Sequence, residues 1–205
     1  MPEQAAPVNR RDEYAQMTRQ EVIKAARKLF AENGYEQTKV ERVAREARVS
    51  PATVYAQCGG KEGLLRSLMD MWTMSPTVAR IMADAVAAPT GAAKLKVLGQ
   101  GYAAHAAEAG DIMAIVERAA ASSDTAREFM DIADERHRES LEVITQSIAD
   151  VGALADGVTV TDAALIIYFH FRNPQFVLAS ETFGWGVERT TQWLTERVAA
   201  AILKD

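Results

Sequence analysis

The stretch EVIKAARKLFAENGYEQTKVERVAREARVSPATVYAQCGGKEGLL, residues 21–65, decides how this chain folds. Its apolar residues recur at intervals of three and four, and Gly34, Pro51 and the Gly59–Gly60 pair punctuate the pattern. Residues at these intervals share one face of a helix, so the pattern predicts amphipathic helices joined by tight turns. The expected helices are Thr18–Asn33, Val40–Ala47, Pro51–Gln57 and a fourth that begins at Lys61.

Three short motifs predict where these helices begin. Thr18 with Glu21, and Thr38 with Glu41, have the spacing of a capping box, in which a hydroxyl and a carboxylate satisfy free backbone N–H groups. Ser50 followed by Pro51 is typical of a helix start, because proline at the first helical position loses no hydrogen bond.

The short third helix is the candidate functional element. It has Val49 and Val54 to bury, and it leaves the remaining side chains with little to do in a core: Pro51, Ala52, Thr53, Tyr55 and Ala56. Two helices joined by a tight turn, with a free outer face on the second, are typical of a helix-turn-helix unit that enters the major groove of DNA. A three-helix cap with ordinary surface hydroxyls fits the same spacing.

Several motifs in register make the resemblance specific. The helix AARKLFAENGY, the patterns T-x-V-x-x-V-A from Thr38 and V-S-x-x-T-x-Y from Val49, and K-E-x-L from Lys61 resemble the N-terminal domain of the TetR family. The segment NPQFVLASETFGWGVERTTQWL, residues 173–194, resembles a C-terminal pattern of the same family. The resemblance implies a three-helix DNA-binding head, a helical ligand-binding body, a homodimer, and repression relieved by a small molecule.

Three positions depart from the family pattern. Arg48 stands in the turn where the family usually has glycine, and a positive φ there would cost a non-glycine residue on the order of 1 kcal/mol. Cys58 replaces an aromatic residue, and Gly60 replaces a serine cap. None of these changes removes a group expected to face DNA.

The expected DNA contacts are of two kinds. Backbone phosphates are expected to meet hydroxyls and a cation, which fix orientation and not sequence: Thr38, Thr53, Tyr55 and Lys61. Base-facing or groove-edge positions, next to the cap Ser50, are Lys39, Arg48, Pro51, Ala52 and Ala56. Proline and alanine offer only apolar contact, for example to a thymine methyl group. Arg10 and Arg11 fit either an arm in the minor groove or a disordered tail.

Charge and composition agree with this assignment. Residues 1–66 carry 12 Lys and Arg against 9 Asp and Glu, whereas residues 67–205 carry 11 against 19, so a mildly basic head precedes an acidic body. The chain is 48% hydrophobic, which excludes disorder, and no apolar run approaches the length of a membrane span. A polar N-terminus and a single cysteine favour a reduced, cytoplasmic protein without a disulfide framework.

Beyond Leu65 the periodicity stays helical, which predicts an all-α chain with no strand. The expected helices are Lys61–Ala87 with a kink near Pro76, Gly91–Ala109, Ile112–Ser122, Thr125–Val151, Thr161–Arg172, Pro174–Gly184 and Val187–Leu203. The predicted domains are a flexible arm (1–17), a helix-turn-helix domain (18–65) and a helical effector-binding and dimerisation domain (66–205).

The resemblance also implies where the body binds partners. The last two long helices would pair with those of a second subunit, along a seam drawn from Leu165, Ile166, Phe169, Val187, Thr191, Leu194 and Val198. An effector would lie among the middle helices, at Trp72, Tyr102, His105, Met113, Val116, Tyr168, Arg172 and Phe176. Methionine and aromatic side chains make adaptable apolar pockets, although the same residues at helical spacing also serve as plain core.

No catalytic motif is present in the sequence, and neither a metal site nor a cofactor is expected. Glu135, His137 and Glu139 alternate at two-residue spacing, which directs them to different sides of a helix. The sequence therefore predicts a homodimeric, ligand-responsive regulator, most simply a repressor of a palindromic operator. The alternatives are a helical small-molecule-binding module and a transcriptional activator of the same family.

Overall fold

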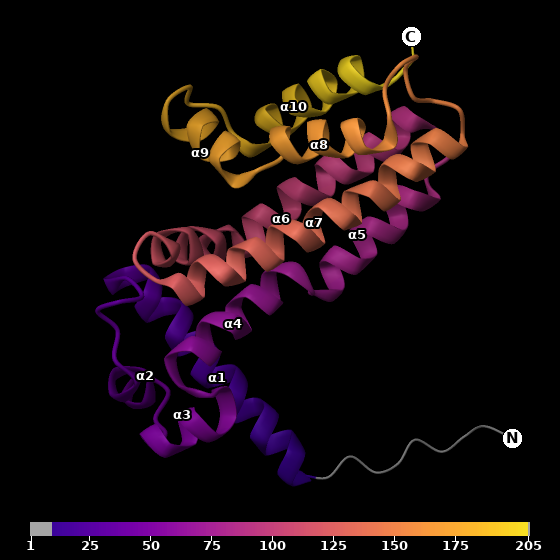
Figure 1. Cartoon of the computed structure of the whole chain (residues 1–205). Helices are drawn as coiled ribbons and strands as arrows, with labels where there is room; N and C mark the ends of the chain where they lie inside the picture. Colours follow the sequence, from indigo (N-terminus) through magenta and orange to yellow (C-terminus); the bar gives the residue numbers. More distant parts are fainter. Residues whose placement is uncertain (1–9, 205) are drawn as a thin grey trace, which may run out of the picture. The chain divides into compact units, whose positions relative to one another are not determined.

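The computed structural model describes residues 10–204, and in this part of the chain the predicted all-α fold is confirmed (Figure 1). Leu154 and Leu203 form an isolated antiparallel β-bridge, which is not part of a strand. The helices are α1 (Arg10–Asn33), α2 (Val40–Glu46), α3 (Pro51–Cys58), α4 (Gly60–Thr73), α5 (Pro76–Ala87), α6 (Gly91–Ala120), α7 (Asp124–Asp150), α8 (Val160–His170), α9 (Asn173–Glu181) and α10 (Val187–Ile202).

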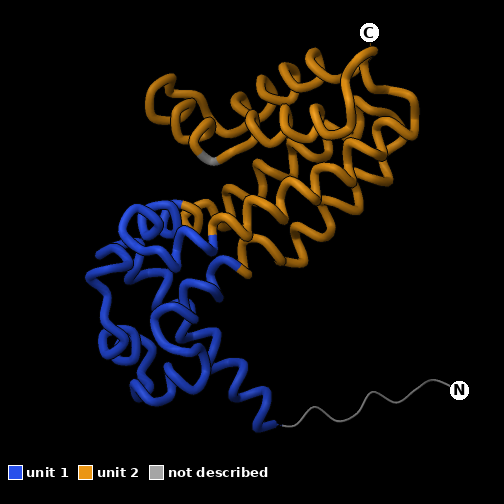
Figure 2. The backbone as a smooth tube through the Cα atoms, in the orientation of Figure 1, with its two compact units in different colours: residues 1–69, 114–129 blue, residues 70–113, 130–205 orange. Residues whose placement is uncertain are grey.

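The chain divides into two compact units (Figure 2). The first contains the described residues up to Met69 together with Ala114–Phe129, and the second contains Asp70–Met113 with Met130 onwards. Three helices, α4, α6 and α7, continue from one unit into the other without a break.

The first unit is built on the apolar faces that the sequence predicts. Helices α1, α2 and α3 contact one another in pairs, and the side chains between them are almost fully buried. The largest contributors are Val22, Leu29, Phe30, Val43, Val54, Leu64 and Leu65. Burying each of these side chains is worth about 1.5–3 kcal/mol, so packing rather than helix propensity holds this small unit together.

The second unit has its own core, formed by one face each of α5, α6, α7, α8 and α10. Its fully buried centre includes Leu95, Leu98, Leu141, Ile144, Ile148, Ile167 and Val198. Lys94 is also buried there, and its ammonium group donates to the carbonyl of Val86 near the end of α5. That bond satisfies one of the carbonyls that a helix end leaves free.

The structure differs from the predicted helices most clearly at the start of α1, within α6 and between α4 and α5. Residues 10–17, expected as part of an arm, form the first turns of α1; residues 1–9 lie outside the described residues. The Thr18 hydroxyl consequently donates to the Tyr14 carbonyl inside the helix and does not cap it. Helix α6 runs unbroken through Gly110, where the sequence predicted two helices. Near Pro76 the expected kink is instead a break: α4 ends at Thr73, and α5 begins at Pro76 with Ser75 as its N-cap.

No helix within residues 10–204 is long and apolar enough to cross a membrane.

Candidate nucleic-acid interface

Helix α3 has a well-formed cap at each end. The Ser50 side chain accepts a hydrogen bond from the Thr53 N–H at 3.1 Å, and Pro51 follows at the first helical position, which confirms the predicted cap. Gly59 closes the helix with φ at 74°, in the left-handed region that glycine adopts at little cost. The helix is thus held to two turns.

One side of α3 is free. Pro51, Ala52, Tyr55 and Ala56 are exposed, whereas Val54 and Cys58 are buried against the rest of the unit. Ala52, Tyr55 and Ala56 are spaced three and four residues apart, so they form one continuous outer face. The sequence placed the same residues outside the core.

The Tyr55 ring is held in a fixed position at the edge of this face. A β-carbon on Gly60 would lie 2.7 Å from Cε1 of Tyr55, so the ring packs directly over the glycine. Tyr55 nonetheless remains 57% exposed. In this chain any side chain at position 60 would meet the ring, so Gly60 leaves room for it.

The turn before α3 is strained, as the sequence implies. Arg48 has φ at 56°, the one non-glycine residue with positive φ in residues 10–204. Arg48 follows Ala47, the C-cap residue of α2. The N–H of the next residue, Val49, donates to the Ala44 carbonyl at 2.9 Å. The Arg48 side chain is exposed, so the strain positions a cation beside α3.

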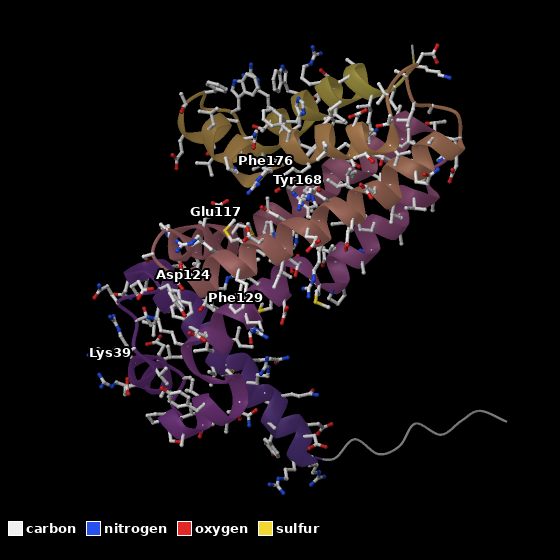
Figure 3. All side chains as sticks on the ribbon, viewed as in Figure 1. Lys39, Glu117, Asp124, Phe129, Tyr168 and Phe176 are labelled. Atoms are coloured by element: carbon white, nitrogen blue, oxygen red, sulfur yellow. The ribbon has the colours of Figure 1, made fainter. Side chains whose placement is uncertain are left out.

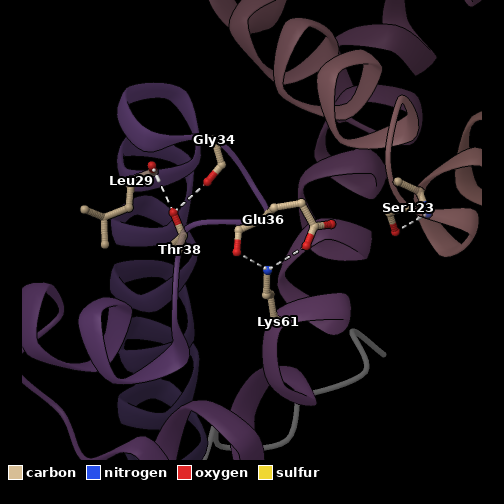
Figure 4. A network of polar contacts seen from close by, with 7 residues as sticks. Leu29, Gly34, Glu36, Thr38, Lys61 and Ser123 are labelled. Carbon is tan, nitrogen blue, oxygen red and sulfur yellow. Dashed lines mark hydrogen bonds and ion pairs between the residues drawn. The ribbon is translucent and has the colours of Figure 1, made fainter.

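Thr38 is placed differently from the sequence prediction. It is only 1% exposed, and its hydroxyl donates to the Gly34 carbonyl at 2.8 Å and lies 3.3 Å from the Leu29 carbonyl (Figure 4). Lys39, not Thr38, is the N-cap of α2, and its side chain makes no capping bond, so Thr38 is not a capping residue either. Because the hydroxyl is buried and already bonded, it is a structural tie between α1 and α2, and we leave it out of the interface.

Lys61 is half-buried beside the start of α4. Its ammonium group donates to the Glu36 carbonyl at 3.1 Å, lies 3.8 Å from the Glu36 carboxylate, and stands 4.2 Å from the centre of the Tyr35 ring (Figure 4). Burial raises the pKa of Tyr35 to about 12, so this phenol stays neutral. The ammonium is oriented by these contacts while part of it remains open to solvent.

Arg19 is a positioning residue that sequence reasoning missed. From α1 its guanidinium donates to the Gln57 carbonyl at the end of α3 and to the Ser67 hydroxyl of α4, the latter at 2.9 Å. Ser67 is buried and in turn bonds to the Gly63 carbonyl. The sequence could have indicated this inward position, because Arg19 lies three residues before the buried Val22 and so shares its side of α1.

The predicted effector residues fall into two groups in the second unit. The first is a chain of rings in which Tyr102 stacks on Phe171 with centroids 4.9 Å apart, and Phe171 meets Phe176 at 6.4 Å. Tyr168, on α8, joins this group through His137 at 5.4 Å (Tyr168 and Phe176 are labelled in Figure 3). Sequence reasoning did not include His137 among the effector residues.

A polar network runs through the same group. The Tyr102 hydroxyl and Nε2 of His137 share a hydrogen bond, and Arg172 donates to the Tyr168 hydroxyl at 2.6 Å and to Asp134 at 3.3 Å. Burial raises the pKa of Tyr102 and lowers the pKa of His137 to about 4, so both are neutral at pH 7. Asp134 and Arg138 lie four residues apart on α7, but the Asp134 carboxylate pairs with Arg172.

The second group is a stacked pair. The rings of Trp72 and His105 lie 4.2 Å apart, and Nε2 of His105 is 3.0 Å from the Trp72 carbonyl near the end of α4. His105 is 6% exposed, and its Nδ1 has no hydrogen-bond partner among the described residues. Met113 and Val116 are buried on α6, and Val116 belongs to the first unit.

A short capped helix with a free outer face, carried on two packed helices and flanked by cations, defines a helix-turn-helix protein. Comparison with known proteins agrees. Residues 22–68 match the family described as bacterial regulatory proteins, tetR family. The chain is 45% identical over 47 residues to the regulator HbdR of Aromatoleum sp. (strain CIB), covering 23% of this chain and 20% of that protein. It is 33% identical over 55 residues to UidR of Escherichia coli (strain K12), covering 27% and 28%.

Solved structures share the fold far beyond this segment. A complex of SmeT with triclosan superposes with a TM-score of 0.79 at 19% identity, over 93% of each chain. The fatty acid degradation regulator FadR of Bacillus halodurans gives a TM-score of 0.75 at 19% identity, over 96% of this chain and 97% of that one. The tetR-family match thus covers residues 22–68, and the chain spans only 20% and 28% of the length of the two curated relatives named above.

Proposed function

We propose that this protein is a homodimeric, ligand-responsive transcriptional repressor. The α3 helices of two subunits would enter successive major grooves of a palindromic operator, with half-sites about 34 Å or a small multiple apart. A small molecule bound to the second unit would release the protein from DNA. SmeT, the repressor of a Stenotrophomonas maltophilia multidrug efflux pump, is one neighbour by fold.

The observation that carries DNA binding is the outer face of α3. Its exposed residues have no partner element within the first unit, while Val54 and Cys58 behind them fix the helix to α1 and α2. Exposed cations flank it at Lys39 and Arg48, where they can meet phosphates. A three-helix cap with a purely structural role would not require an exposed helix face flanked by cations.

The proposed dimer interface is the outer side of α8 and α10. Leu165 and Phe169 are 47% and 65% exposed one helical turn apart on α8, and Trp193 on α10 is 45% exposed. Three residues of the expected seam are instead buried within the chain itself: Thr191, Leu194 and Val198. The interface is therefore proposed without them, because a side chain packed in its own core has no surface to offer a partner.

Ligand response is proposed to act through α4. This helix runs from the first unit into the second, and His105 bonds to the Trp72 carbonyl near its end. A ligand that binds better when this end is displaced would shift the population away from the DNA-bound form. A ligand with equal affinity for both forms would change nothing.

The deciding experiment is footprinting on the DNA flanking the protein's own coding region, followed by fluorescence anisotropy on the protected duplex. We expect a symmetric protected region and tighter binding than to a shuffled duplex of the same composition. Equal, weak binding to both duplexes would overturn DNA regulation and favour the helical small-molecule-binding module. Transcription assays on the protected promoter distinguish a repressor from an activator.

A further inference from the structure

The outer face of α3 is almost entirely hydrocarbon. Pro51, Ala52 and Ala56 present methyl and methylene groups to solvent, and none of these side chains has a hydrogen-bond donor or acceptor. Among the residues that look outward from the helix, Tyr55 supplies the polar atom, at the end of a ring fixed over Gly60.

The other polar side chains of α3 are already engaged or turned aside. The Ser50 hydroxyl accepts from the Thr53 N–H and bonds to the Thr53 hydroxyl at 2.8 Å. Gln57 lies one residue beyond the outer face and is half-buried, next to the Arg19 guanidinium that its carbonyl binds. The face is thus poor in groups that could bond to base edges.

Such a surface matches one feature of the major groove. Each base pair presents donors and acceptors there, and thymine alone adds an apolar group, its 5-methyl. A polar base edge placed against Pro51, Ala52 or Ala56 would lose its water without gaining a partner. We propose that α3 selects its operator by packing these three residues on thymine methyl groups, with Lys39 and Arg48 gripping the groove edges. The proposal rests on the DNA binding proposed above.

The test removes only the methyl groups. Duplexes bound by the full-length protein are first selected from a random pool, and thymines of the selected half-site are then replaced by uracil, one at a time. Each contacted methyl group should be worth about fourfold in affinity, so a symmetric pair should be worth about tenfold or more. Uracil placed outside the half-sites should have no effect and serves as the control.

A matched pair of protein variants assigns the contact. In Ala52→Gly or Ala56→Gly, the uracil effect at the contacted base pair should shrink, because the packing partner is gone. Ala31 lies on the exposed side of α1, so Ala31→Gly should lower stability by the same amount, about 0.5–1 kcal/mol. It should keep the full uracil effect. Ala52→Ser, which avoids the glycine penalty, is the second variant at this position.

The outcomes separate the two proposals. If no duplex is enriched over the shuffled pool, the proposed DNA-binding function fails. If a duplex is enriched and its uracil version binds equally well at every half-site position, DNA binding stands and the methyl-reading inference is overturned. A loss on uracil substitution that persists unchanged in both alanine-to-glycine variants would also overturn the assignment to α3.

Discussion

Gly63, in the first turn of α4, lies so close to Cys58 that a β-carbon at position 63 would overlap the Cys58 backbone carbonyl oxygen. Cys58 is the last residue of α3, so this contact sets where α3 ends relative to α4. Gly63→Ala should therefore lower the free energy of unfolding by about 1–3 kcal/mol and also weaken DNA binding. Urea denaturation and anisotropy measure the two effects.

The matched control is Gly110→Ala. Gly110 lies inside α6, and a β-carbon there would meet nothing within 4 Å. Alanine is the better helix former, so this variant should gain about 0.5–1 kcal/mol. Effects of the same sign at positions 63 and 110 would contradict the close approach.

Arg48→Gly should separate stability from DNA binding. Glycine relieves a positive φ that costs an L-residue about 1–2 kcal/mol. Its greater freedom in the unfolded chain lowers stability by about 0.4–1 kcal/mol, which offsets part of that gain. We expect a net gain in stability of up to about 1 kcal/mol together with weaker, less salt-dependent DNA binding. Arg45→Gly, within α2, is the control and should lose stability, because its backbone is helical. A loss at both positions would argue against strain at Arg48.

Lys61→Ala should weaken binding to all duplexes by a similar factor. It should also reduce the slope of log affinity against log salt by about 1 for each phosphate that the lysine neutralises. Tyr55→Phe should also act on all sequences alike, but without changing the slope, because it removes no charge. Glu36→Gln is the control, since it removes the carboxylate beside Lys61 and keeps the cation. An unchanged salt slope in Lys61→Ala would refute the phosphate assignment.

Sequence predicted most accurately what is local and repeated. Ser50 caps α3 as expected, and Thr159 caps α8 with the same kind of bond, the Asp162 N–H donating to its hydroxyl at 3.0 Å. Thr38 has the same motif, yet the hydroxyl turns inward because two carbonyls of α1 and its following turn lie within reach. A capping motif states what a hydroxyl can do, and tertiary packing decides which partner it takes.

The polar network of the second unit was harder to predict, for a physical reason. His137 continues the buried stripe of α7 formed by Ala133, Leu141, Ile144 and Ile148, a signal present in the sequence. The partners Tyr102 and Arg172 come from helices far away in the chain, and no local pattern links them. Spacing within α7 alone would pair Asp134 with Arg138, but Asp134 pairs with Arg172, the residue just before α9.

Phe169→Asp, with Leu165→Asp, should convert the proposed dimer into a monomer. Both residues are exposed on one face of α8, and a carboxylate buried between two subunits would be strongly unfavourable. Light scattering at micromolar concentration should show half the mass of the original protein. Val151→Asp alters an equally exposed apolar residue outside α8 and α10 and should leave the mass unchanged. A monomeric original protein would contradict the proposed interface.

Acid should destabilise the second unit through His137. Burial is the largest cause of its lowered pKa, about 4; the Arg172 charge acts in the same direction and the Asp134 carboxylate against it. The unfolded chain, with an ordinary histidine pKa near 6.5, binds the proton more readily. The stabilisation is therefore complete above about pH 6.5 and is lost as the pH falls towards 4, and it amounts to at most about 3 kcal/mol.

His137→Gln keeps a hydrogen-bonding group for Tyr102 but cannot titrate. Its free energy of unfolding should accordingly vary less between pH 6.5 and 4 than that of the original protein, as measured by urea denaturation at each pH. Burial also lowers the pKa of His105, so His105→Gln is the comparison, with a change of the same sign. If His137→Gln retained the full pH dependence, the imidazole would have to be charged or solvated in the folded protein, and its neutral bond to Tyr102 would be refuted.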